Sequence, residues 1–193
     1  MAARTEECVV VGVRLYMVRH GKAAAGWDQD HDPGLDDTGR AQAREMAEAL
    51  APHGPLPLVS SPLRRARETA TPLEDLWSAA AAIEPRIAEI PSPTDDLAER
   101  RAWLNRVMTD SWTNQTADLR AWRDGVVAAL CGLPRDAVMV SHFIAINAAV
   151  GAATGDDRVV GFRPGNCSVT VLEVADGALS LVERGRELDS EVL

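Results

Sequence analysis

The chain has 193 residues, and its 29 acidic side chains outnumber the 20 basic ones, which gives a formal net charge of −9 at pH 7. This charge excludes general electrostatic attraction to nucleic acid or to an anionic membrane surface. Apolar residues at 46% and charged residues at 25% exclude a disordered or fibrous chain, and the length predicts a single domain spanning residues 1–193.

Targeting signals and a disulfide framework are not indicated by the sequence. Residues 1–12 lack the apolar stretch of a signal peptide and form a candidate flexible amino terminus. No apolar run approaches the ~18 residues of a membrane span. Cys8, Cys131 and Cys167 form no CxxC pair, so neither disulfides nor a zinc site are expected. We therefore expect a cytoplasmic protein.

The first predicted strand ends at a group of polar residues. The apolar run at residues 14–18 is typical of a buried strand, and the tripeptide Arg19-His20-Gly21 follows it directly. A loop rich in Gly, Asp and Pro comes next. Asp36 or Asp37 can then cap a helix that runs to about residue 50.

A second strand, at residues 56–60, leads into a helix with its own start signal. Ser61 and Pro62 match an N-cap followed by proline at the first helical position. Because proline lacks the amide hydrogen and clashes with the preceding turn, Pro72 is expected to interrupt or kink this helix. Residues 74–82 are then expected to continue as a further helical piece.

The middle of the chain continues the alternation of strands and helices. Residues 84–90 predict a third strand, and the stretches at about 95–109 and 117–131 predict two helices. The clearest strand is at residues 137–141, with His142 at its end and an apolar, helix-like segment to Ala153 behind it.

Two final strands, at residues 168–175 and 178–183, are expected to form a hairpin around Asp176-Gly177. Taken together, the alternation of strands and helices predicts an α/β fold with a largely parallel sheet.

Two histidines stand where α/β proteins bind ligands. His20 and His142 each follow a predicted strand, and ligands of open α/β sheets bind outside the carboxyl ends of the strands. The two side chains can therefore share one crevice despite their separation in sequence.

Cations and carboxylates accompany these histidines. Arg19 directly precedes His20. Arg64 and Arg65 lie where the helix after the second predicted strand is expected to start. Glu84 and Glu89 lie near the end of the third predicted strand. Helix N-termini and arginines both favour phosphate. Each piece alone has an ordinary structural explanation, such as a capped basic helix or a surface carboxylate. The set as a whole supplies a nucleophile, oxyanion-binding cations and an acid, as phosphoryl transfer requires.

Six short motifs and single residues occur in a characteristic order along the chain. They are Leu-Tyr-Met-Val-Arg-His-Gly at 15–21, Leu-Asp-Asp-Thr-Gly-Arg-Ala-Gln-Ala at 35–43, Ser-Ser-Pro-Leu-Arg-Arg-Ala-Arg-Glu-Thr-Ala at 60–70, Glu89, Val-Met-Val-Ser-His at 138–142 and Asn-Cys-Ser-Val at 166–169. This ordered set resembles the histidine phosphatase superfamily, also called phosphoglycerate mutase-like. The resemblance implies a three-layer α/β/α sandwich with a mostly parallel central sheet.

The resemblance also implies a role for each matched residue. His20 would be the nucleophile and would form a phosphohistidine intermediate, which its ordinary pKa of ~6.5 permits at pH 7. Arg19, Arg65 and His142 would hold the non-bridging phosphate oxygens. Glu89 would protonate the leaving oxygen and then help to activate water. No metal ion or other cofactor is expected.

Three features of the chain qualify the resemblance. Within the Arg64-Arg65 pair the family pattern selects Arg65, because it directly precedes Ala66. The usual residues after Arg-His-Gly are replaced by Lys-Ala-Ala-Ala-Gly-Trp at 22–27, and Phe143 stands where the family often has a small residue.

The subfamily remains open at this point. Residues 21–42 look more like the phosphohistidine-phosphatase branch, which lacks the carboxylate acid, whereas Glu89 favours hydrolysis of a phosphomonoester. The family's mutases are typically longer and carry a Trp-Asn motif that is missing here, so a monofunctional phosphatase is favoured over a mutase. A protein phosphohistidine phosphatase is the alternative enzyme, and a non-catalytic phosphoester-binding protein is the alternative of another class.

The substrate is expected to be a small phosphorylated molecule or a phosphoprotein. The residues that select it are expected in segments 22–33 and 91–119, with Lys22 and Trp27 as candidate pocket residues. Asp28, Asp30 and Asp32 resemble the start of a calcium loop, but Pro33 occupies the required glycine position, so no metal site is expected. Arg163, before Pro164, has two candidate roles: contact with the substrate or, as favoured, a surface salt bridge. The sequence does not indicate an oligomeric state.

Overall fold

The structure, a computed structural model, describes residues 12–26 and 29–188. The candidate flexible amino terminus, except for Gly12, therefore lies outside the described residues. Cys8, Trp27 and Asp28 lie outside them too.

The centre of the fold is a six-stranded sheet of order β3-β2-β4-β1-β5-β6. Its strands are β1 (Val13–Arg19), β2 (Leu58–Ser60), β3 (Ala82–Ile83), β4 (Ala137–Ser141), β5 (Val169–Ala175) and β6 (Ala178–Glu183). The first four strands pair in parallel, whereas β5 is antiparallel to both β1 and β6. The sheet is thus mostly parallel, and the predicted α/β fold is confirmed.

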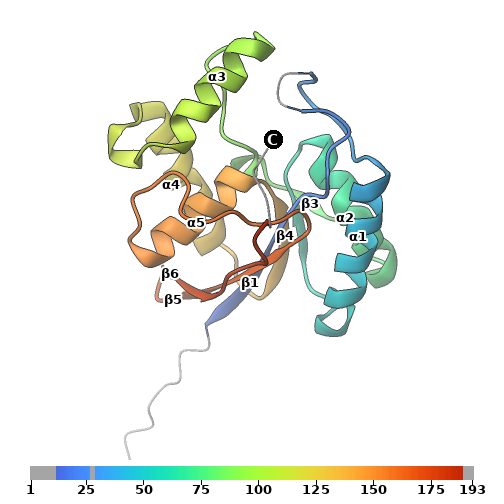
Figure 1. Ribbon diagram of the computed structural model, residues 1–193. Helices are drawn as coiled ribbons and strands as arrows, with labels where there is room; N and C mark the ends of the chain where they lie inside the picture. The colour runs from blue at the N-terminus through green and yellow to red at the C-terminus, as the bar shows by residue number, and fades with distance from the viewer. Residues whose placement is uncertain (1–11, 27–28, 189–193) are drawn as a thin grey trace, which may run out of the picture.

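Helices cover both faces of the sheet (Figure 1). They are α1 (Asp37–Leu50), α2 (Arg64–Trp77), α3 (Leu97–Met108), α4 (Ala117–Cys131) and α5 (Phe143–Thr154), with short 3₁₀ turns η1 (Ala51–His53), η2 (Pro85–Ile87) and η3 (Trp112–Asn114). One apolar cluster joins α1 and α2 to the sheet, and another joins α4 and α5 to its other face. Helix α3 lies at the end of the molecule toward which β1 runs. Within the described part of the chain, no helix is long and apolar enough to span a membrane.

The register of the parallel strands positions the site. Arg19 at the end of β1 pairs with Ser141 at the end of β4, and Ser60 at the end of β2 pairs with Val140. The next residues therefore leave the sheet side by side. All five residues of β4 are buried, which explains the apolar run from Ala137 to Val140, since a central parallel strand is covered on both faces.

The predicted start of the second helix is wrong. Helix α2 begins at Arg64 with Leu63 as N-cap and no capping side chain, so Ser61 and Pro62 belong to the loop before it. The Ser61 hydroxyl instead accepts a hydrogen bond from the Leu63 N–H at 3.2 Å. This is a local turn of the kind that serine offers in competition with a helix cap.

The predicted break at Pro72 is also wrong, because α2 continues through it to Trp77. The buried face of the helix, which includes Ala70 and Leu73, packs on the sheet on both sides of the proline. This packing outweighs the local cost of the missing hydrogen bond.

The segment after α2 differs from the prediction as well. The helix ends at Trp77 with Ser78 in the left-handed conformation (φ 50°), so residues 74–82 are not one helical piece. The expected strand at 84–90 is replaced by the two-residue edge strand β3 and the turn η2. Pro85 opens that turn, and a residue without an amide hydrogen cannot continue a strand ladder.

Two local predictions that involve aspartates, a helix cap and a hairpin turn, are confirmed. The Asp36 carboxylate accepts a hydrogen bond from the Gly39 N–H at 2.7 Å and caps α1. Asp176 and Gly177 join β5 to β6 with φ of 53° and 75°, the positive values that a two-residue type I′ hairpin turn requires.

A close backbone approach explains Gly39 in the first turn of α1. A Cβ atom at this position would overlap the carbonyl oxygen of Lys22. We expect Gly39→Ala to lower the free energy of unfolding by about 1–3 kcal/mol, the usual cost of forcing an atom into a filled space. Urea denaturation measures the change.

The matched control is Gly125→Ala in α4, where nothing lies within 4 Å of the added Cβ. Replacing a glycine inside a helix by alanine should raise the free energy of unfolding there by about 0.5–1 kcal/mol. Equal stability changes for the two variants would contradict the close approach.

Candidate active site

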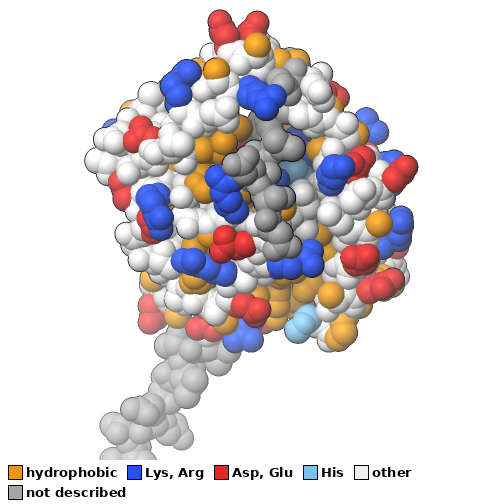
Figure 2. Space-filling view, in the orientation of Figure 1, with side chains coloured by type: hydrophobic (Ala, Val, Ile, Leu, Met, Phe, Trp, Pro, Cys, Tyr) orange, Lys and Arg blue, Asp and Glu red, His pale blue; other side chains and the backbone are white. Residues whose placement is uncertain are grey.

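A cleft of about 580 Å³ opens beyond the carboxyl ends of the central strands. Its buried residues are His20, Arg65, Glu89, Phe143 and Ile144, and the half-buried Arg19 lies beside them. Its outer residues come from the loop after β1 and from α3. Lysine and arginine side chains gather around this hollow on the face shown in Figure 2.

The His20 ring is held in one tautomer by its two neighbours. Its Nδ1 lies 2.8 Å from the Gly21 carbonyl oxygen, which can only accept a hydrogen bond, and Arg65 Nε, which can only donate, lies 3.2 Å from its Nε2. Nδ1 is therefore the protonated nitrogen and Nε2 carries a lone pair. Burial, assisted by the charges of Arg65 and Arg19, holds the pKa of His20 well below 6.5. The ring is thus neutral at neutral pH.

The backbone of His20 is fixed as firmly as its ring. Its N–H donates to the Ser141 carbonyl at 3.0 Å, and its carbonyl accepts from the Asn166 side chain at 2.9 Å. The next residue must be glycine, because a Cβ on Gly21 would lie 2.6 Å from the Gly39 carbonyl oxygen. Asn166 was noticed in the sequence only as part of a strand motif, and its contact with His20 was not anticipated.

Arg19 is a half-buried cation that lines the cleft. It donates to the Pro164 carbonyl at 2.9 Å and lies 5.1 Å from the centre of the Phe143 ring. Its Nε is buried without a hydrogen-bond partner. Burial is the main reason that its pKa falls to about 10, with Arg65 adding to the effect and Glu89 opposing it. The side chain is therefore still charged at neutral pH.

The side chains of the two consecutive arginines at the start of α2 lie in different environments. Arg65 is only 5% exposed and reaches His20, whereas Arg64 lies on the surface and pairs with Glu68 at 2.7 Å. Arg65, the residue that the family pattern selects, is therefore the one in the cleft.

Glu89 is a buried carboxyl group, and only one of its two oxygens accepts hydrogen bonds from the described residues. Its Oε1 accepts hydrogen bonds from the Ile90 N–H at 3.0 Å and from the Ile144 N–H, at the start of α5, at 3.2 Å. Its Oε2 is buried and has no hydrogen-bond partner among the described residues. Burial raises the pKa of Glu89 above its ordinary value of 4.5, which favours a proton on the carboxyl. Glu84, the other carboxylate considered, lies outside the cleft and pairs with Arg86 at 2.6 Å.

His142 is fully buried beside His20, with 5.1 Å between the ring centres. It occupies the N-cap position of α5, and its Nε2 lies 2.7 Å from the Ser61 hydroxyl. Its Nδ1 has no hydrogen-bond partner in the part of the chain that the structure describes. Burial is the main reason that the pKa of His142 lies well below 6.5, and electrostatic interactions with His20, Arg65 and Arg19 lower it further. Two guanidinium groups, two neutral imidazoles and one buried carboxyl thus converge on one small space.

The outer part of the cleft comes from the two segments expected to select a substrate. Lys22 lines it and pairs with Asp36 at 3.0 Å, but Trp27 lies outside the described residues. From α3 come side chains that no motif had indicated, namely Arg100, Arg101, Leu104, Asn105 and Met108.

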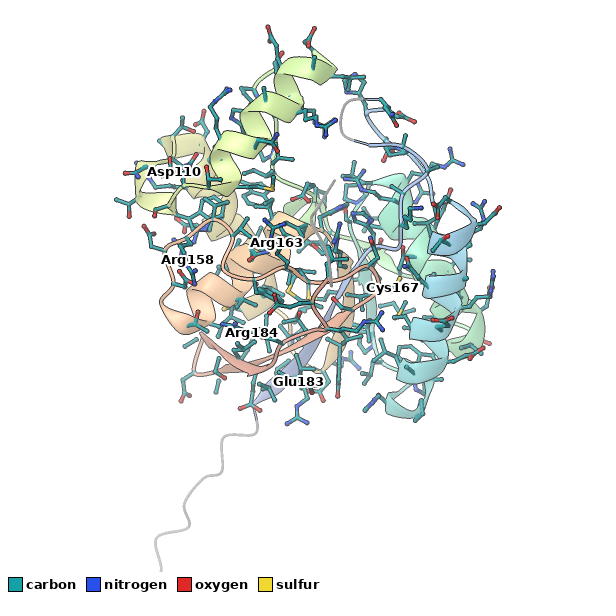
Figure 3. All side chains as sticks on the ribbon, viewed as in Figure 1. Asp110, Arg158, Arg163, Cys167, Glu183 and Arg184 are labelled. Atoms are coloured by element: carbon teal, nitrogen blue, oxygen red, sulfur yellow. The ribbon has the colours of Figure 1, made fainter. Side chains whose placement is uncertain are left out.

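Arg163 is labelled in Figure 3 and lies on the segment between α5 and β5, and it is not among the residues that line the cleft. Its backbone N–H donates to the Glu187 carboxylate at 3.2 Å. Within the described part of the chain its side chain forms no ion pair with a carboxylate, so the expected surface salt bridge is not found there. Among the described residues, no three His, Cys, Asp or Glu side chains are grouped so that they could hold a metal ion.

Comparison with known proteins identifies the family of the chain. The model of the histidine phosphatase superfamily (branch 1) matches residues 15–186. The chain belongs to this superfamily. The match spans nearly all of the described residues and includes every side chain of the site.

Two curated proteins show similarity in sequence. The first is glucosyl-3-phosphoglycerate phosphatase of Mycolicibacterium vanbaalenii, 42% identical over 80 residues, which cover 39% of this chain and 36% of that protein. The alignment thus spans little more than a third of that relative. The second is uncharacterized protein Rv0525 of Mycobacterium tuberculosis, 32% identical over 146 residues, or 67% of this chain and 72% of the relative.

Solved structures share the fold. A mycobacterial glucosyl-3-phosphoglycerate phosphatase superposes with a TM-score of 0.68 at 25% identity, covering 91% of this chain and 100% of that one. A protein described as mycobacterial hydrolase 1 gives a TM-score of 0.70 at 24% identity over 92% of this chain and 100% of its own. These structures show the shared fold, whereas the superfamily and the similarity to glucosyl-3-phosphoglycerate phosphatase support a phosphatase activity.

The buried carboxyl can be tested by titration. We expect Glu89 to titrate above 4.5 because burial disfavours its charged form, and Glu84 to titrate below 4.5 because Arg86 stabilises its charge. Carbon-detected NMR of the side-chain carboxyl groups, assigned with Glu89→Gln and Glu84→Gln, measures both values. A Glu89 midpoint at or below that of Glu84 would contradict the electrostatics described above.

Proposed function

We propose that the protein is a phosphatase that hydrolyses a phosphomonoester through a phosphohistidine intermediate on His20. The observation that carries this proposal is the state of the His20 ring. Its Nδ1 proton is engaged by Gly21, so the lone pair on Nε2 is directed toward Arg65 at the base of the cleft. A neutral imidazole with an available lone pair is the form that can attack phosphorus.

The first step would transfer the phosphoryl group to the protein. His20 Nε2 forms a bond to phosphorus while the bond from phosphorus to the ester oxygen breaks. Arg65 gives up its contact with Nε2 and, with Arg19, holds the non-bridging oxygens, which are more negative in the transition state. Glu89 gives its proton to the departing oxygen, so the alcohol leaves neutral.

The second step would return the protein to its starting state. The Glu89 carboxylate, now ionised, accepts a proton from a water molecule as that water attacks phosphorus. The bond from phosphorus to Nε2 breaks, and inorganic phosphate leaves with His20 neutral again. No metal ion takes part in either step, because Arg19 and Arg65 supply the positive charge.

Glu89 favours an ester over a phosphohistidine as substrate. An alkoxide is a poor leaving group that needs a proton, and the buried Glu89 Oε2 has no other partner. A phosphorylated imidazole needs less help to leave, so a buried acid at this place would be superfluous for it.

The cleft suits a compact substrate. A volume of about 580 Å³ is in the range of small-molecule sites, and the protein's acidic net charge opposes long anionic polymers. A panel of small phosphomonoesters that includes glucosyl-3-phosphoglycerate, the compound in a relative's name, is the appropriate substrate screen.

The nucleophile is tested by His20→Ala. We expect kcat for p-nitrophenyl phosphate to fall at least ~10³-fold, since no other group can form the intermediate. The wild-type protein, quenched during turnover of labelled substrate, should retain a base-stable, acid-labile phosphoryl group that His20→Ala lacks.

The matched control is His53→Ala, a histidine on η1 that packs on Tyr16 with ring centres 5.3 Å apart, outside the cleft. It should retain wild-type activity. Equal activity in wild type and His20→Ala would exclude His20 as nucleophile. Phosphate binding without any phosphoenzyme would favour the non-catalytic alternative.

The acid is tested by Glu89→Gln with substrates of different leaving groups. Hydrolysis of an alkyl phosphate should fall roughly 10²–10⁴-fold, but that of p-nitrophenyl phosphate only about tenfold or less, because nitrophenolate leaves without a proton. Loss of ester hydrolysis with hydrolysis of a phosphoramidate retained would favour the phosphohistidine phosphatase instead.

The same variant tests the pH dependence of kcat/KM. Activity needs neutral His20 and protonated Glu89, so it should fall below the lowered pKa of His20 and above the raised pKa of Glu89. Glu89→Gln removes the second group, and the decline on the alkaline side should disappear for the alkyl phosphate. An unchanged alkaline decline would show that another group causes it.

A further inference from the structure

Ser61 touches the catalytic machinery but has no part in the steps above. It directly follows β2, is fully buried, and places its hydroxyl 2.7 Å from Nε2 of His142. The sequence predicts a helix cap at this position, but in the structure the Ser61 hydroxyl does not cap α2. The contact concerns the way His142 meets a phosphoryl group, so an inference from it rests on the proposed function.

The donors and acceptors around the Ser61 hydroxyl limit the hydrogen bonds that it can form. A serine hydroxyl has one hydrogen to donate and two lone pairs to accept with. The Leu63 N–H donates to this oxygen at 3.2 Å. Across the described residues, the only acceptor within reach of the hydroxyl hydrogen is Nε2 of His142. The contact can therefore run in either direction, and the two directions leave different atoms unpaired.

In the first arrangement Ser61 donates to Nε2, so the His142 proton resides on Nδ1. Of these two side chains, only the Nδ1–H of His142 then lacks a partner among the described residues. In the second arrangement Nε2–H donates to Ser61, and two buried groups are unpaired, namely the Ser61 hydrogen and the Nδ1 lone pair. Since an unmade hydrogen bond of a buried group destabilises the folded state, the first arrangement is preferred.

The first arrangement also matches what a phosphoryl group needs. The His142 ring lies 5.1 Å from the His20 ring and is close enough to Arg19 and Arg65 to feel their charges. A phosphoryl oxygen beside His20 would be attracted by an N–H on this ring and repelled by a lone pair. The single unpaired atom, Nδ1, is thus useful to the reaction only when it carries the proton.

We propose that Ser61 is a positioning residue that fixes His142 as its Nδ1–H tautomer. The chain of hydrogen bonds runs from the Leu63 N–H to the Ser61 oxygen and from the Ser61 O–H to His142 Nε2. Its effect is that His142 presents an N–H, and not a lone pair, to the phosphoryl oxygen at His20.

The tautomer can be measured in the resting protein. The sequence has four histidines, so ¹⁵N labelling of histidine with long-range nitrogen–proton correlation gives few signals, and His142→Gln assigns the one of interest. We expect wild-type His142 to show a protonated Nδ1 and an unprotonated Nε2. In Ser61→Ala the signal should move toward the Nε2–H form or a mixture of both.

Ser60→Ala is the matched control. Ser60 is buried to the same extent and its hydroxyl donates one hydrogen bond, to the Ser61 carbonyl at 2.9 Å, but it does not contact His142. It should leave the His142 tautomer as in wild type. Calorimetric binding of inorganic phosphate to the full chain gives the second measurement. We expect Ser61→Ala to weaken binding roughly tenfold and Ser60→Ala about twofold or less.

Neither measurement needs turnover, so this inference and the proposed function can fail separately. A wild-type His142 with its proton on Nε2 would overturn the proposal even if Ser61→Ala did not fold. Equal phosphate affinity in the Ser61→Ala and Ser60→Ala variants would overturn it as well. Loss of the Nδ1–H form together with weaker phosphate binding in Ser61→Ala alone would support it.

Discussion

The hydrogen bond from the His20 N–H to the Ser141 carbonyl is the contact on which the site depends. It extends the pairing of β1 and β4 by one residue beyond the strands, and the bond from the Ser61 N–H to the Val140 carbonyl does the same for β2. Backbone pairing thus places His20, Ser61 and His142 side by side before any side chain acts. The loop before β5 secures the arrangement, since Asn166 holds the His20 carbonyl.

Burial then selects the protonation states that the chemistry uses. Removal from water disfavours charge, so it lowers the pKa of His20 and His142 and raises that of Glu89. Arg19 and Arg65 add to the first effect, but they oppose the second by favouring the Glu89 carboxylate. The carboxyl can therefore be protonated before the first step, and the same cations can stabilise its charge after it has given the proton away.

The sequence predicted most of what depends on local pattern. The apolar runs of β1 and β4, the Asp36 cap and the Asp176-Gly177 turn are features of a few consecutive residues. The predictions from sequence were wrong where tertiary contacts override a local pattern. Pro72 stays inside α2 because the helix packs on the sheet on both sides of it, and Ser61 is diverted from a helix cap by His142, 81 residues away. The α3 side chains of the cleft carry no motif because their role arises from their position in the fold.

The acidic net charge of −9 and the cationic cleft are compatible because they act over different distances. Exposed charges are screened within about 10 Å in ordinary buffer, so a long polyanion meets the surface as a whole. A phosphate group that enters the cleft meets Arg19 and Arg65 at short range and largely out of water, where their attraction is screened far less. The same chain can therefore repel extended anionic polymers and hold a single compact phosphate. The selection depends on the size of the anion as much as on its charge.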